Sequence, residues 1–88
     1  MTLRIETTSD DQSATLRLIG RIDSESLGEL QAEVRRHQPR LQLDMHEVTL
    51  VDVGVVRFLI ACEADGIALL HCAPYIQEWM SRERNREK

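Results

Sequence analysis

The chain has 88 residues, with 15 acidic side chains, 11 lysines and arginines, and a net charge of −4. A chain of this length has room for one hydrophobic core and buries roughly 60% of its unfolded surface, which argues against a deep pocket for a large ligand. The acidic balance disfavours nucleic acid as a partner, because affinity for phosphates depends chiefly on lysine and arginine. Aromatic residues make up 3% of the sequence, so the core must be largely aliphatic.

The first half of the chain predicts a hairpin followed by a helix. Apolar and polar residues alternate over residues 3–7 and again over residues 14–18, with a short polar turn between them. Such alternation predicts two half-buried antiparallel strands. Ser26 and Glu29 then fit a helix capping box, and Pro39 would stop that helix. The predicted apolar stripe of the helix consists of Leu27, Leu30 and Val34.

The second half predicts two further strands and two further helices. Residues 41–45 alternate as a strand does, whereas residues 55–62 form an apolar run, interrupted only by Arg57, that is too long for a typical strand. We predict a helix over Gly54–Glu63, ended by Asp65 and Gly66. The run Ile67–Leu70 predicts a buried strand, and Pro74 suits the first turn of a last helix. The apolar stripe of that helix consists of Ile76, Trp79 and Met80.

The predicted order is strand–strand–helix–strand–helix–strand–helix, which indicates an α/β fold. Strand–helix–strand alternation predicts a small, mostly parallel sheet with an antiparallel N-terminal strand and with helices packed against it. We expect one domain over residues 1–80 and a charged helix end or tail over residues 81–88. Neither an apolar leader nor a run of about 18 apolar residues is visible. We therefore expect a cytoplasmic protein without membrane insertion.

The apolar helix, taken here as Val53–Cys62, is the most informative candidate for a binding element. A helix with so many apolar residues must either be buried on most sides or expose an apolar face that binds a partner. In so small a domain, complete burial is hard to arrange. The face that we expect in the core consists of Val55, Leu59 and Cys62. The face that we expect to be exposed consists of Val53, Val56, Arg57 and Ile60.

Asp52, directly before this helix, has two compatible interpretations. It can cap the helix, because orphan backbone N–H groups and the helix dipole favour a carboxylate there. It can also face a partner as a hydrogen-bond acceptor. Earlier in the chain, Ser24 and Ser26 lie among acidic residues but have no histidine nearby to act as a base. We interpret that segment as a helix cap.

The cysteines and histidines do not form a pattern typical of a metal site or an active site. Cys62 and Cys72 lack the tight spacing of zinc ligands, and the adjacent His71 would point to the opposite face of a strand from Cys72. We expect both cysteines to be reduced, as small buried hydrophobes. His37 is expected to contact the last carbonyls of its helix. With no glycine-rich phosphate loop either, we expect no metal, no cofactor and no enzymatic activity.

Four stretches stand in the order and spacing of a known family. They are LIGRID at 18–23, LQLD at 41–44, EVTLVD at 47–52 and the segment from Gly66 through Pro74 to Met80. Together they span residues 14–80 and resemble the STAS family of anti-sigma-factor antagonists. The resemblance implies the same α/β fold, and it implies that a protein partner docks on the loop after Asp52 and on the following helix.

The chain departs from this family where its phosphorylation switch would be. The family pattern after the aspartate is Asp-Ser-Ser/Ala-Gly-Leu, and an anti-sigma kinase phosphorylates the first serine. Here Val53 stands in the place of that serine, Gly54 in that of the small residue and Val55 in that of the glycine. Valine has no oxygen to accept a phosphate, so the resemblance predicts no phosphorylation site at this loop.

The resemblance implies a non-enzymatic protein-interaction domain. The partner-binding residues that it indicates are Asp52, Val53, Gly54, Val56, Arg57 and Ile60. The first expected partner is an anti-sigma factor of the histidine-kinase-like ATPase type, in the control of bacterial transcription. One alternative is an accessory STAS subunit of a membrane transporter's ATPase, which needs no phosphorylatable serine. Another is a small-ligand-binding STAS domain or an enzyme, against which the scarcity of aromatic residues argues. The formation of a homodimer stays open.

Overall fold

A computed structural model describes residues 3–38 and 40–86. Its elements follow the predicted order. They are β1 (Leu3–Ser9), β2 (Ala14–Ile22), α1 (Ser24–His37), β3 (Leu41–Val51), α2 (Val53–Ala64), β4 (Ala68–Leu70) and α3 (Pro74–Arg86). The α/β class and the hairpin at the start of the chain are therefore confirmed.

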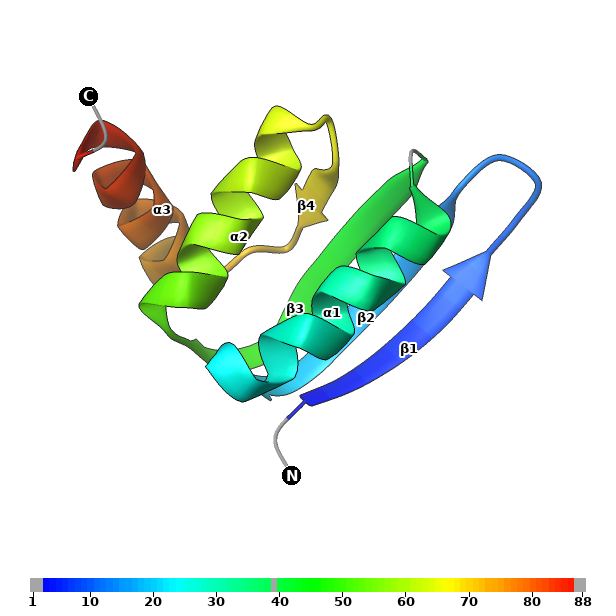
Figure 1. Cartoon of the computed structure of the whole chain (residues 1–88), viewed down its shortest axis with the longest axis horizontal. Helices are drawn as coiled ribbons and strands as arrows, with labels where there is room; N and C mark the ends of the chain where they lie inside the picture. The colour runs from blue at the N-terminus through cyan, green and yellow to red at the C-terminus, as the bar shows by residue number, and fades with distance from the viewer. Residues whose placement is uncertain (1–2, 39, 87–88) are drawn as a thin grey trace.

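The strands form one sheet in the order β1-β2-β3-β4. The pair β1–β2 is antiparallel and the other two pairs are parallel, which confirms the predicted mixed sheet. The three helices lie side by side, with α2 between α1 and α3 (Figure 1). The prediction of a buried strand at Ile67–Leu70 is wrong in part. Strand β4 is short and pairs only with β3, so it is an edge strand, and Ala68 is exposed.

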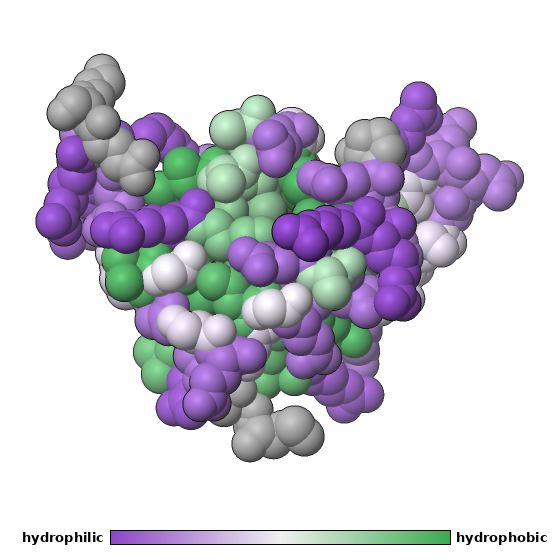
Figure 2. All heavy atoms as spheres, viewed as in Figure 1, coloured by the Kyte–Doolittle hydropathy of each residue, from purple (hydrophilic) through white to green (hydrophobic). Residues whose placement is uncertain are grey.

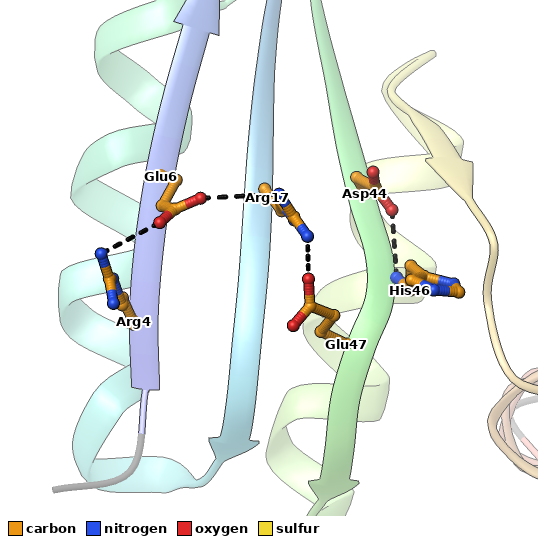
Figure 3. A network of polar contacts seen from close by, with 6 residues as sticks. All are labelled: Arg4, Glu6, Arg17, Asp44, His46 and Glu47. Carbon is orange, nitrogen blue, oxygen red and sulfur yellow. Dashed lines mark hydrogen bonds and ion pairs between the residues drawn. The ribbon is translucent and has the colours of Figure 1, made fainter.

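The two faces of the sheet differ sharply in polarity. Alternate residues of the two central strands point toward the helices and are buried: Ala14, Leu16 and Leu18 in β2, and Leu41, Leu43 and Met45 in β3. The residues between them form an uncovered face that carries charged side chains (Figure 3). The register between β2 and β3 shifts after Arg17, so the next buried residue of β3 after Met45 is Val48. Because of this irregularity, strict alternation in the sequence predicts only the first part of β3.

Helix α1 begins three residues earlier than the capping box suggests. Asp23 is its N-cap, and the Asp23 side chain accepts a hydrogen bond from the Ser26 N–H at 3.1 Å. The prediction of Ser26 as the cap is therefore wrong, although the segment does serve capping. The helix ends at His37, whose Nε2 lies 3.6 Å from a Glu33 carboxylate oxygen. Pro39, the predicted stop, lies outside the described residues.

The core is aliphatic, as the scarcity of aromatic residues predicts. The stripes of α1 and α3 supply Leu30, Val34, Ile76 and Met80, all buried, while Trp79 packs against the core from a half-buried position. Seen from the helix side, hydrophobic residues lie at the centre of the molecule and hydrophilic residues surround them (Figure 2). In the described part of the chain, no helix is long and apolar enough to span a membrane.

Candidate functional site

Asp52 lies between β3 and α2 and joins the starts of two helices. Its Oδ1 accepts a hydrogen bond from the Val55 N–H at 3.0 Å, which makes it the N-cap of α2. Its Oδ2 accepts two more, from the Ser24 N–H and from the Ser24 hydroxyl, both at 2.9 Å. The capping interpretation of Asp52 is therefore confirmed. The contact with Ser24 was not foreseen, because 28 residues separate the two in sequence.

These contacts lower the pKa of the Asp52 carboxyl below its usual value. The largest cause is the hydrogen bond from the Val55 N–H; the bonds from Ser24 act in the same direction, and burial opposes them. Each favourable contact stabilises the ionised form, because a carboxylate is the better acceptor. Both oxygens of Asp52 already have donors within the chain. The residue therefore positions the β3–α2 turn, and any contact with a partner would be additional to these bonds.

Helix α2 is buried on a larger part of its circumference than the two-face interpretation predicts. Val55, Leu59 and Cys62 are buried as expected. Val56, expected on an exposed face, has an exposed fraction of 0%, and Ile60 is half-buried against the core. The expectation that Val56 is exposed is wrong. The physical reason is that α3 packs along this side of α2, so the apolar arc of the central helix is much wider than that of a helix at a surface.

The start of α2 is different, because Val53 and the end of the preceding strand remain exposed. Three large hydrophobic side chains are exposed in the described part of the chain: Leu50 at 55%, Tyr75 at 44% and Val53 at 43%. Leu50 and Val53 flank Asp52, and the Tyr75 hydroxyl donates a hydrogen bond to the Thr49 carbonyl oxygen at 2.8 Å. All three therefore gather at the carboxyl end of β3. We call Leu50, Val53 and Tyr75 the β3–α2 surface.

Sequence reasoning found one of these three residues. That residue is Val53, whereas Leu50 stands only within the stretch EVTLVD at 47–52 and Tyr75 has no predicted role. A signal for Leu50 exists in the run Val48–Val51, where two adjacent apolar residues cannot both point into the core. No local signal exists for Tyr75, because its position beside Thr49 follows from the docking of α3. Of the other candidates, Gly54 is half-buried in the first turn of α2 and Arg57 is exposed.

Comparison with known families bears on this site directly. A family model described as "Mlab, STAS domain" matches residues 5–69. The chain belongs to the STAS domain family. A comparison with curated proteins found no match. The matched segment of this STAS domain contains β3, Asp52 and α2, and it ends within β4, so α3 lies outside it.

STAS domains are generally non-enzymatic interaction domains that commonly mediate contacts between proteins. The family is linked to anti-sigma-factor antagonism and to roles of the sulfate-transporter type. Within this STAS domain, α3 is attached to α2 by ion pairs. Glu83 is buried, with an oxygen 3.4 Å from Arg57 Nε and another 3.5 Å from Arg86 Nη1. Nearly two turns further along α2, Glu63 pairs with Arg84 at 2.6 Å. The charged segment after Met80 is thus part of helix α3 as far as Arg86.

The cysteines and histidines of this STAS domain do not converge. Cys62 is buried and Cys72 half-buried, and both are free. Burial and the nearby Asp65 raise the pKa of Cys62 to about 12, and burial also raises the pKa of Cys72. The rings of His46 and His71 meet edge to face, with centroids 5.8 Å apart. Within residues 3–38 and 40–86, no three histidine, cysteine or acidic side chains are placed to hold a metal ion.

Proposed function

We propose that this STAS domain binds a protein partner through the β3–α2 surface. The observation that carries the proposal is the exposure of Leu50, Val53 and Tyr75 at one turn, in a domain whose other described large hydrophobic side chains are at least partly buried. Hydrophobic side chains gathered on a surface are typical of protein contacts. The family resemblance supports a docking site at the same turn. The network around Asp52 supports this role, because it holds the turn in one conformation before binding.

The first candidate partner is an anti-sigma factor of the histidine-kinase-like ATPase type, with this chain as its antagonist in the control of transcription. Val53 stands in the place of the phosphorylated serine, so a kinase of this type cannot release itself by modifying that position. With kinase and ATP, residues 52–56 should stay unmodified in mass spectrometry. Stoichiometric phosphate on the exposed Thr49 would show instead that the switch has moved.

The second candidate partner is the ATPase of a membrane transporter, with this chain as an accessory subunit. The observation that favours it is Val53 itself, an apolar side chain at 43% exposure in the place of the switch residue. An exposed valine can form a lasting apolar contact with a partner, but it cannot be switched by phosphorylation. Adjacent genes distinguish the two candidates, since an anti-sigma kinase gene supports the first and transporter genes support the second.

Binding to each purified ATPase class tests the proposal. Val53→Glu should remove binding, because a carboxylate facing an apolar partner loses its hydration without gaining a hydrogen bond. It should leave the free domain folded, since position 53 is exposed. The matched control is Ala61→Glu, which places the same charge at an exposed position two turns further along α2 and should preserve binding. Retention of binding by Val53→Glu together with its loss in Ala61→Glu would contradict the proposed surface.

A further inference from the structure

A ladder of alternating charges crosses the uncovered face of the sheet and ends at its outer edge. Glu47 on β3 pairs with Arg17 on β2, and Arg17 Nη1 lies 3.7 Å from Glu6 Oε1 on β1. Glu6 Oε2 in turn lies 3.1 Å from Arg4 Nη2, on the same strand. Figure 3 shows Arg4 on the outer side of β1, away from β2. The last charge of the ladder is therefore directed past the edge of the sheet.

This edge is regular and open. Strand β1 pairs with β2 alone, over seven residues and without a register shift. Half of the backbone N–H and C=O groups of such a strand point away from the sheet and can pair with another strand. Among the devices that block an edge, Leu3–Ser9 contains no bulge, proline or lysine, and its two charged side chains are Arg4 and Glu6, of opposite sign. Nothing is drawn beside this edge in Figure 1.

We propose that two copies of this domain associate through their β1 strands, antiparallel, with Arg4 of each copy opposite Glu6 of the other. A two-fold axis through Ile5 gives this register. The sheet then continues across both copies as eight strands, and the charge ladder continues with it. On the helix side of the sheet, the same register brings together the half-buried Ile5 of each copy and sets Leu3 opposite Thr7.

Charge selects this register over its neighbours. Residues that lie directly opposite each other on paired strands point to the same face of the sheet. A change of register must therefore keep Arg4 and Glu6 on the uncovered face and Leu3 and Ile5 on the helix side. One neighbouring register opposes Arg4 with Arg4, and the other opposes Glu6 with Glu6. Like charges directly opposite each other destabilise a strand pair. An unrelated strand would not place opposite charges against both Arg4 and Glu6, whereas a second copy of this chain does.

The association is independent of the docking surface proposed above. In the sheet, β2 separates β1 from β3, so each copy keeps its β3–α2 surface free. Two joined copies would present two docking surfaces to partners. A single pair of seven-residue edges is smaller than a stable interface, which buries at least about 1,200 Å². We therefore expect a weak dimer whose population depends on protein concentration.

Charge reversal tests the proposal by sedimentation velocity, up to millimolar protein. Arg4→Glu and Glu6→Arg, each alone, should raise the dissociation constant of the dimer about tenfold, because like charges then face each other twice. The double variant Arg4→Glu/Glu6→Arg restores opposite charges and should return the constant to within about threefold of wild type. A wild-type chain that stays monomeric throughout, single variants that dimerise normally, or a double variant without recovery would each overturn the proposal.

Hydrogen exchange provides a test that needs no variant, should a charge reversal impair folding. Amides of β1 that point away from β2 should exchange more slowly as the concentration of wild-type protein rises, because pairing with a second copy protects them. The amides of β4, at the opposite edge, serve as the internal control and should not change. Concentration-dependent protection at β4 and none at β1 would place the contact between copies at the wrong edge for this proposal.

Discussion

Two valines in the first turn of one helix have opposite surroundings. Val53 and Val56 both lie at the start of α2, yet Val53 is 43% exposed and Val56 is fully buried. The difference arises because α3 packs against the flank of α2 that carries Val56, whereas Val53 points away from that contact and stays exposed. The comparison shows that the exposed hydrophobic surface lies at the turn before the helix, and that the flank of the helix serves the core.

The largest effect should follow from the same substitution at these two positions. Val56→Glu buries a carboxylate without a partner, which costs several kcal/mol, a large part of the roughly 5–15 kcal/mol that stabilises a domain. The Val56→Glu variant should be unfolded. For Val53→Glu, the free energy of unfolding should stay within about 0.5 kcal/mol of the wild-type value, as it does for exposed substitutions. Circular-dichroism melts compare the two. A folded Val56→Glu protein would show that α3 does not cover this flank in solution.

A smaller effect should follow from Asp52, which holds the turn before the two valines. Asp52→Ala removes the cap of α2 and both bonds from Ser24, and caps are worth about 0.5–2 kcal/mol. The network places the loss at the upper end of that range. Urea denaturation measures it. Ser24→Ala serves as a partial control, because it removes the hydroxyl donor and keeps the backbone donor. A loss in Ser24→Ala equal to that in Asp52→Ala would contradict the capping role.

Acid should weaken the same network. The pKa of Asp52 is lower in the folded chain than its ordinary value of 3.8. Its stabilising contribution is therefore complete above the unfolded pKa and is lost as the pH falls through the folded pKa. Stability below pH 4 should thus decline more steeply in wild type than in Asp52→Asn. The pKa of Asp10 is lowered as well, but it is common to both proteins and cancels in the difference. Parallel curves would show that Asp52 is not stabilised as an anion.

The smallest effect should be a gain in stability at Gly54, beside Val53. A Cβ at position 54 would lie 3.5 Å from Asp52 Oδ1 and 3.6 Å from Ser24 Oγ, which are ordinary contacts. Gly54→Ala should therefore stabilise the helix by about 0.5–1 kcal/mol. Gly66→Ala is the matched control of opposite sign, because Gly66 has a φ of +89°. A destabilised Gly54→Ala protein would show that the turn is packed more tightly than these distances indicate.

Local patterns predicted most of the fold, and contacts distant in sequence account for what they missed. Alternation in the hairpin and the stripe of α1 identify their elements, since each depends on residues within a few positions. The burial of Val56 depends on where α3 packs, and the Ser24–Asp52 bonds depend on how two helix starts meet. Neither leaves a local signal. The sequence predicts the position of the turn and carries a signal for Leu50 beside it, whereas the exposed Tyr75 is visible only in the structure.

Methyl cross-saturation in a complex with the partner tests the central claim most directly. The chain is deuterated except for its valine and leucine methyl groups, and the protons of the bound ATPase are saturated. We predict that the methyl signals of Val53 and Leu50 lose intensity and that the signal of Val56, buried beneath α3, does not. Full intensity at Val53 and Leu50, with losses at methyl groups elsewhere on the domain, would contradict the assignment of the β3–α2 surface as the docking site.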